Sequence, residues 1–234
     1  MSRRKKAKKS TTILLAVVIF IGILAASLGI QLYMSPDFKG FTQEPQPDPI
    51  VTVLPGSDAQ DGEQGNAPYN WEDHKIFIIG DSLTKGAQKE IEKVLPDATI
   101  DGKEGRNMAQ GVQILQGWKD TGVLSDTAIV IVCLANNITG STVNDAQTIV
   151  DMIEPGQSLI MMTGHGLREM APANEFIRTL PNVYSFVTVA DWDLTIAQSP
   201  ALLSSDGIHI ARNQGNVLYA SLILRALEVA QPRP

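Results

Sequence analysis

From Trp71 onward, short apolar runs alternate with segments whose apolar residues recur at helical spacing. Because a helical segment separates each run from the next, the pattern predicts a parallel sheet that is buried on both faces, that is, a three-layer α/β sandwich. Residues 71–234 are enough for one hydrophobic core, and the chain contains no internal repeat. The predicted strands cover residues 75–79, 98–100, 127–134, 158–162 and 183–189.

Five helices are predicted between and after these strands. The first places Leu83, Ala87, Ile91 and Val94 on one helical face. The others cover residues 108–115, 143–153, 171–180 and 214–229.

The longest apolar stretch of the chain precedes this domain. Residues 13–34 carry no charge, and at ~1.5 Å per residue they span the ~30 Å hydrocarbon core of a bilayer, which predicts a transmembrane helix. Six Lys and Arg residues lie among the first ten, so residues 1–12 are predicted as a basic cytoplasmic tail of a single-pass bacterial membrane protein with its domain outside. The alternative is a cleaved signal peptide, because residues 25–27 are small, although such peptides usually have an apolar core of ~7 to 15 residues.

Between this segment and the domain, residues 35–70 are rich in proline. They hold six of the 13 prolines and few large apolar side chains, which predicts a disordered linker. A flexible chain of this length reaches roughly 30 to 36 Å, so the domain is expected to stay near the membrane.

The charge distribution limits the classes of binding partner that are expected. The formal net charge is -6, but without the six basic residues at the N-terminus the rest of the chain has 19 - 6 = 13 basic and 25 acidic residues, or -12. Such an acidic body repels polyanions, so a nucleic-acid partner is not expected. Cys133 is the one cysteine, which excludes an intrachain disulfide and a Cys-rich zinc site, and its apolar strand predicts a buried, inert thiol.

A candidate nucleophile follows the first predicted strand. Ser82 lies just beyond the strand's carboxyl end and at a helix start, where open α/β sheets bind ligands and backbone N–H groups favour an anion. The alternative is that Asp81 and Ser82 only cap the helix, since Asp and Ser are preferred N-cap residues.

A serine nucleophile needs a base, and the chain offers three histidines. His209 has Asp206 three residues before it, so that one tight turn can bring carboxylate and imidazole together. His165 follows the fourth strand at the same sheet edge and either lines the site or is a satisfied loop histidine. His74 precedes the first strand among polar residues, which predicts a surface position.

Donors for a developing oxyanion are candidates at two further strand ends. Gly105 follows the second strand, and Asn136 and Asn137 follow the third. The alternative is that each of them only forms a turn, because Gly and Asn are common turn residues. Arg106, beside Gly105, either binds a carboxylate or phosphate of the substrate or forms a structural salt bridge.

Together these segments match one family. Residues 80–83 read Gly-Asp-Ser-Leu, Gly105 falls at the second block, Asn137 at the third, and residues 206–209 read Asp-Gly-Ile-His. In order and spacing the chain resembles the SGNH (GDSL) hydrolases across residues 75–229. Residues 105–106, 134–137, 191–192 and 205–209 are most similar to the extracellular domain of peptidoglycan O-acetyltransferases.

The resemblance implies a flavodoxin-like sheet, no metal and no organic cofactor. It implies Ser82 as nucleophile, His209 as base and Asp206 as its orienting acid, with an oxyanion hole formed by the Ser82 and Gly105 N–H groups and the Asn137 side chain. The third block of the family usually reads Gly-x-Asn, whereas Ala135 replaces the glycine here. Asn136 is therefore an alternative to Asn137.

The implied function is that of a membrane-anchored extracellular serine esterase or O-acyltransferase acting on acetyl esters of cell-wall glycan or of another acylated envelope polymer. A transferase would work beside a separate membrane protein that supplies the acyl group. The alternative is a non-catalytic module that binds the cell wall or scaffolds an envelope complex. A lipase-like hydrolase is disfavoured by the modest aromatic content of 6%.

Overall fold

The computed structural model of the protein describes residues 48–52 and 70–234. The predicted cytoplasmic tail, the transmembrane helix at 13–34 and most of the linker at 35–70 lie outside the described residues. Among those that are described, no helix has the length and apolar character needed to cross a membrane.

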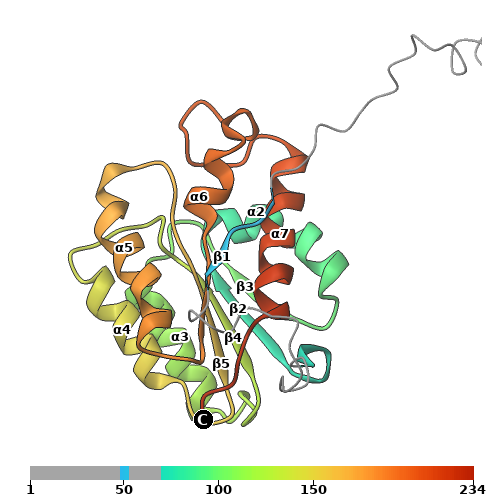
Figure 1. The fold of residues 1–234 in the computed structure, drawn as a ribbon, viewed down its shortest axis with the longest axis vertical. Coiled ribbons are helices and arrows are strands. Elements are labelled where there is room, and N and C mark those ends of the chain that lie inside the picture. The colour runs from blue at the N-terminus through green and yellow to red at the C-terminus, as the bar shows by residue number, and fades with distance from the viewer. Residues whose placement is uncertain (1–47, 53–69) are drawn as a thin grey trace, which may run out of the picture. The chain divides into compact units, whose positions relative to one another are not determined.

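The domain is built on a six-stranded sheet with the order β1-β6-β5-β4-β2-β3 (Figure 1). Five strands are parallel, and β1 pairs antiparallel with β6. Without β1, the strands in chain order lie as second, first, third, fourth and fifth, which is the flavodoxin-like arrangement. The strands are β1 (Val51–Thr52), β2 (Ile76–Gly80), β3 (Thr99–Gly102), β4 (Ile129–Cys133), β5 (Ser158–Met162) and β6 (Val187–Ala190).

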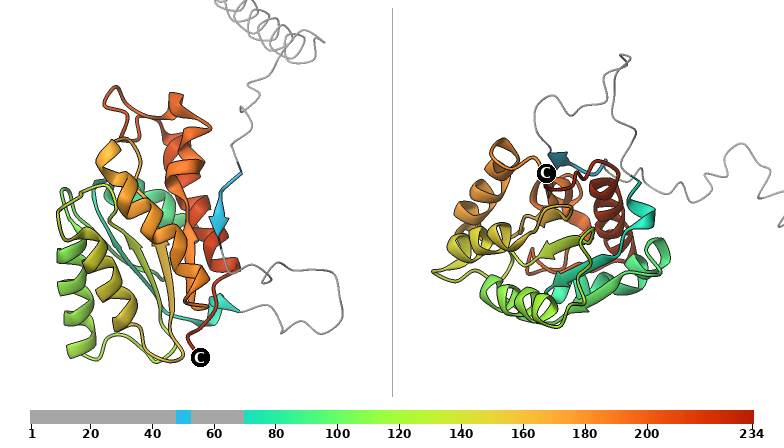
Figure 2. Two further views of the ribbon diagram at one scale, coloured as in Figure 1. Left: turned by 60° about the vertical axis from the view of Figure 1, so that its left-hand side comes forward. Right: turned by 90° about the horizontal axis from the view of Figure 1, so that it is seen from below.

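Helices cover both faces of the sheet, which confirms the three-layer prediction (Figures 1 and 2). Helices α3, α4 and α5 pack on one face, and α2 and α7 pack together on the other. The α-helices are α2 (Ser82–Val94), α3 (Met108–Asp120), α4 (Thr142–Met152), α5 (Ala171–Thr179), α6 (Trp192–Ala197) and α7 (Asn213–Glu228). Short 3-10 helices are η1 (Trp71–Asp73), η2 (Arg168–Met170), η3 (Leu180–Asn182) and η4 (Pro200–Leu202).

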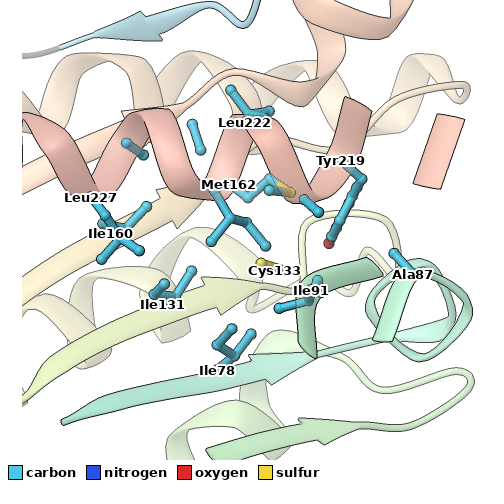
Figure 3. Close-up of a cluster of buried hydrophobic side chains, with 14 of the residues drawn as sticks. Ile78, Ala87, Ile91, Ile131, Cys133, Ile160, Met162, Tyr219, Leu222 and Leu227 are labelled. Atoms are coloured by element: carbon cyan, nitrogen blue, oxygen red, sulfur yellow. The ribbon is translucent and has the colours of Figure 1, made fainter. Parts of the chain in front are cut away.

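Side chains of each central strand alternate between two hydrophobic cores. Ile78 of β2 belongs to the core beneath α2 and α7, whereas its neighbour Ile79 belongs to the core beneath α3 and α4. Figure 3 shows Ile131 and Ile160 of the neighbouring strands in the first core, below Leu222 of α7. Strands β2, β4 and β5 are buried over their whole length and almost entirely apolar, which is why they stand out in the sequence, whereas the edge strand β3 is only partly buried.

The linker prediction is wrong for Val51 and Thr52, which form β1. Val51 pairs with Ala190 and Thr52 with Val189, while the carbonyl oxygen of Ile50 accepts the N–H of Asp191 at 2.8 Å. The edge of β6 would otherwise expose unpaired backbone groups, and β-branched residues suit an added strand. Local composition, dominated by the surrounding prolines, concealed this pairing.

Two further differences concern the start of β6 and the presence of α6. Strand β6 begins at Val187 rather than at Val183, because residues 180–182 form η3 and Val183 is exposed. Helix α6 was not predicted, since six residues are too few for a helical period to be visible. The end of β6 and the start of α6 lie at the sheet edge that carries the candidate site.

Candidate active site

Ser82 is placed by a tight connection between β2 and α2. Asp81 caps the helix by accepting the Leu83 N–H at 2.9 Å, so the Ser82 hydroxyl is not the cap. A Cβ at Gly80 would lie 1.9 Å from Thr84 Oγ1, which is why the turn requires glycine. The half-buried Ser82 therefore stands at the carboxyl end of β2, between β3 and β4, at the switch point of the sheet.

The structure brings Ser82, His209 and Asp206 together in one hydrogen-bonded series. Ser82 Oγ lies 3.0 Å from His209 Nε2, and His209 Nδ1 lies 2.8 Å from Asp206 Oδ2. Because an ionised carboxylate only accepts, Nδ1 carries the proton and the Nε2 lone pair faces the Ser82 hydroxyl. This is the arrangement in which an imidazole can take a proton from a serine.

Asp206 is held ionised by its own loop. Its Oδ1 accepts the Ser204 hydroxyl at 2.6 Å and the N–H groups of Ile208 and His209 at 2.9 Å each. These bonds, that from Ser204 foremost, keep the pKa of Asp206 well below its ordinary value. A β-bridge between Leu203 and Ile210 closes the loop, so both catalytic candidates sit on one preformed turn.

Two backbone donors near Ser82 are unpaired in the part of the chain that the structure describes. Neither the N–H of Ser82 nor that of Gly105 has an acceptor there. Gly105 lies in a turn with a φ of 69°, a left-handed conformation that favours glycine. Glu104 accepts from Lys85 of α2 at 2.9 Å, which ties this turn to the first turn of the helix.

The two asparagines after β4 have different free groups. Both donate to Asp81 Oδ2, Asn136 at 3.2 Å and Asn137 at 3.3 Å. Asn136 also accepts the His165 N–H through Oδ1 at 2.9 Å, whereas Asn137 has no other partner among the described residues. Each amide keeps a second N–H that has no acceptor among the described residues, so each can donate to an oxyanion, and the two differ in that Asn136 is also fixed through its Oδ1. Burial raises the pKa of the Asp81 carboxyl on which both amides converge.

Arg106 is buried and engaged rather than open to a ligand. Its side chain is 6% exposed, and its guanidinium donates to the Gly80 carbonyl oxygen at 3.1 Å, to Asp101 Oδ1 at 2.6 Å and to the Asp101 carbonyl oxygen. Of the two interpretations of Arg106, the structural salt bridge thus fits better than substrate binding. Arg106 fastens the turn that carries Gly105 to the end of β2.

We expect Arg106→Met to lower kcat for a chromogenic acetyl ester by about 10- to 100-fold with little change in KM, because Gly105 would lose its fixed position. Steady-state kinetics measure both constants, and thermal unfolding reports whether the variant is folded. Arg225→Met is the matched control, since Arg225 is exposed on α7 and pairs with Glu228. A rise in KM alone would instead indicate direct contact with the substrate.

The remaining sequence candidates lie apart from Ser82 or deep in the core. His74 Nδ1 lies 2.8 Å from the Thr127 carbonyl oxygen, near the amino ends of the strands. Cys133 is buried, and burial raises the pKa of its thiol to about 12, so it stays protonated. His165 does lie on the site edge, with Nδ1 2.8 Å from Asp193 Oδ1.

The sequence analysis missed the partners of His165. Asp193 lies in the first turn of α6, and Arg178 of α5 donates both to Asp193 Oδ2 at 2.8 Å and to the buried Asp191. Asp191 follows β6 as Asp81 follows β2, and this repeated position at strand ends was the signal available in the sequence.

The fold has close counterparts among solved structures. The C-terminal catalytic domain of Streptococcus pneumoniae peptidoglycan O-acetyltransferase A (OatA) superimposes with a TM-score of 0.64 at 23% identity, covering 69% of this chain and 96% of that one. A member of the lipolytic protein G-D-S-L family from Veillonella parvula DSM 2008 gives a TM-score of 0.55 at 14% identity, covering 65% and 97%. The domain has the SGNH hydrolase fold.

One curated protein matches the SGNH domain by sequence. It is the “putative peptidoglycan O-acetyltransferase YrhL” of Bacillus subtilis (strain 168), which is 22% identical over 154 residues, or 66% of this chain. The matched part makes up 24% of YrhL, so the chain corresponds to about a quarter of that protein. No protein-family model matches the chain.

Proposed function

We propose that the SGNH domain is a serine esterase or O-acetyltransferase that acts on acetyl esters of cell-wall glycan. The observation that carries the proposal is the series Ser82 Oγ, His209 and Asp206, joined at 3.0 and 2.8 Å beside two backbone N–H groups that have no acceptor among the described residues. A binding module has no need of a serine aligned with an oriented imidazole. A covalent acyl-enzyme mechanism needs both.

In the first half-reaction, Ser82 Oγ attacks the carbonyl carbon of the ester while its proton passes to His209 Nε2. The N–H groups of Ser82 and Gly105 and the Asn137 amide stabilise the resulting oxyanion, and Asp206 stabilises the imidazolium. The bond to the alcohol oxygen then breaks, and His209 returns the proton to that oxygen. The products are the free alcohol and acetylated Ser82.

In the second half-reaction, His209 removes a proton from the acceptor, whose oxygen attacks the acetyl carbonyl. Collapse of this intermediate breaks the bond to Ser82 Oγ, which regains its proton from His209. If the acceptor is water, acetate is released; if it is a sugar hydroxyl, the acetyl group is transferred. The same residues serve both outcomes, so the acceptor that reaches the acyl-enzyme decides between them.

Cell-wall glycan is proposed as substrate because OatA and YrhL are both named as peptidoglycan O-acetyltransferases. An outward-facing domain on an N-terminal single-pass anchor, as proposed from the charge and apolar pattern of residues 1–34, would reach that polymer from the bacterial membrane. A transferase would then receive its acetyl group from a separate membrane protein.

Two measurements on the purified full-length chain test the proposal. A fluorophosphonate probe should label the peptide that contains Ser82 and should fail to label Ser82→Ala. Incubation with O-acetylated peptidoglycan, and separately with an acetyl donor plus wall oligosaccharide, should yield free acetate for an esterase or acetylated sugar for a transferase. Glycan binding without any labelling or turnover would support the non-catalytic module instead.

A further inference from the structure

A pocket of about 490 Å³ lies beside the loop that carries Asp206 and His209. Its walls come from residues 165–167 after β5, from Asp193 at the start of α6 and from residues within 200–207. Ser204, Ser205 and Gly207 belong both to the pocket and to the catalytic loop. A ligand in this pocket would therefore be adjacent to the proposed reaction.

The His165 imidazole in this pocket is held at one ring nitrogen, and its other ring nitrogen is available to a ligand. Asp193 Oδ1 lies 2.8 Å from His165 Nδ1, and Asp193 Oδ2 accepts from Arg178 Nη2 at 2.8 Å. The carboxylate accepts, so Nδ1 carries the proton and Nε2 presents a lone pair. Within the described residues Nε2 has no partner, and the His165 side chain is 21% exposed.

The pocket lining favours an uncharged, hydroxylated ligand. Among the described residues, Asp193 is the one acidic side chain of the pocket, and both of its carboxylate oxygens already accept hydrogen bonds. No described Lys or Arg lines the pocket, so an anion meets no counter-charge from them. Leu167 and Pro200 offer apolar surface, while Ser205 and His165 offer polar groups. A sugar ring, with its C–H face and its hydroxyl groups, combines the same two requirements.

Hydrogen bonds also connect His165, which lines the pocket, to the residue before Ser82. The backbone N–H of His165 donates to Asn136 Oδ1 at 2.9 Å, and Asn136 in turn donates to Asp81, the residue before Ser82. The backbone of His165 is thus bonded to Asn136, near the nucleophile, and its side chain is bonded to Asp193.

We propose that this pocket binds the uncharged sugar residue next to the acetylated one, with His165 Nε2 accepting a hydrogen bond from a sugar hydroxyl. Asp193 and Arg178 act as positioning residues that hold the imidazole. The inference rests on the proposed function for the identity of the neighbouring ester, but binding in the pocket can be measured without turnover.

The test uses the full-length chain with Ser82→Ala, which prevents turnover, and titrates it with neutral N-acetylglucosamine oligomers and with anionic galacturonic acid oligomers of equal length. We expect the neutral oligomer to bind and the anionic one to bind at least about tenfold more weakly. Adding His165→Ala should weaken the neutral oligomer about tenfold, because one hydrogen bond is lost. Adding His165→Gln should restore part of the affinity, since its amide oxygen can accept.

His74→Ala is the matched control, because His74 lies near the amino ends of the strands, away from the pocket, and it should leave affinity unchanged. With Ser82 intact, His165→Ala should raise KM for an acetylated oligosaccharide more than it lowers kcat/KM for a small acetyl ester. Equal affinity in His165→Ala, equal binding of the anionic oligomer or no binding of either oligomer overturns the inference. Binding that depends on His165 in a protein without ester turnover would contradict the proposed function and support the pocket.

Discussion

Replacing Ser82 with alanine is expected to reduce kcat for acetyl ester hydrolysis by about 10⁵-fold, to the level that binding and oxyanion donors alone sustain. The reason is that no other described hydroxyl lies within hydrogen-bond distance of His209 Nε2, so the acyl-enzyme cannot form. Initial rates with a chromogenic acetyl ester at saturating concentration measure the effect.

Ser125→Ala is a suitable control for this experiment, because Ser125 precedes β4 at the opposite end of the sheet. Its backbone carbonyl oxygen accepts from Ala128 and Gln157, and the substitution keeps that oxygen. His209→Ala should cost a similar factor, and the double variant should be no slower than either single one, since serine and base act as a unit. Near-normal turnover by Ser82→Ala would rule out the mechanism.

Asp206→Asn is expected to lower kcat by about 10³-fold while the fold is retained. The introduced amide would donate toward His209 Nδ1, which would place the imidazole proton on Nε2, facing Ser82. An imidazole in that tautomer cannot accept the serine proton. Steady-state kinetics measure the loss, and circular dichroism checks the fold.

The pH dependence provides a second check on Asp206. Its loop holds the pKa of this carboxyl well below the ordinary value near 4, so it stays ionised as the pH falls from 8 to 5. The carboxyl ¹³C chemical shift of Asp206, followed by NMR, should therefore show no titration of this group over that range. With its pKa depressed on folding, the carboxylate also stabilises the folded loop above about pH 4 and loses this contribution only in stronger acid. Titration of the Asp206 carboxyl between pH 6 and 5 would contradict this account.

Much of the architecture was accessible from local pattern. The predicted strand at 158–162 coincides with β5, and the ends of the helices at 143–153 and 214–229 differ from α4 and α7 by one residue. Strands that are buried on both faces are apolar over their whole length, so their positions follow from the sequence. The prediction failed at β1 and α6, which are too short to show a period of their own.

The site was accessible from the sequence only in part. A serine at a strand end and an Asp-x-x-His turn are local signals, and they identified Ser82, Asp206 and His209. Arg106 has no such signal: its position beside Gly105 is compatible with binding or with structure, and only burial against Gly80 and Asp101 distinguishes the two. The tertiary structure also distinguishes Asn136 from Asn137, because of the two only Asn136 accepts the His165 backbone N–H among the described residues.

The sequence by itself thus determined most of the helices and strands and the candidate residues Ser82, Asp206 and His209, because periodicity, capping and turn motifs depend on residues close along the chain. Only the tertiary structure decided which side chains remain free to act. His165 and Arg178 lie in the connection from β5 to β6, whereas Asp193 follows β6; His165 and Asp193 meet because the parallel strands β5 and β6 bring their carboxyl ends to one edge. No spacing in the sequence encodes that meeting, since it is set by the order of strands in the sheet.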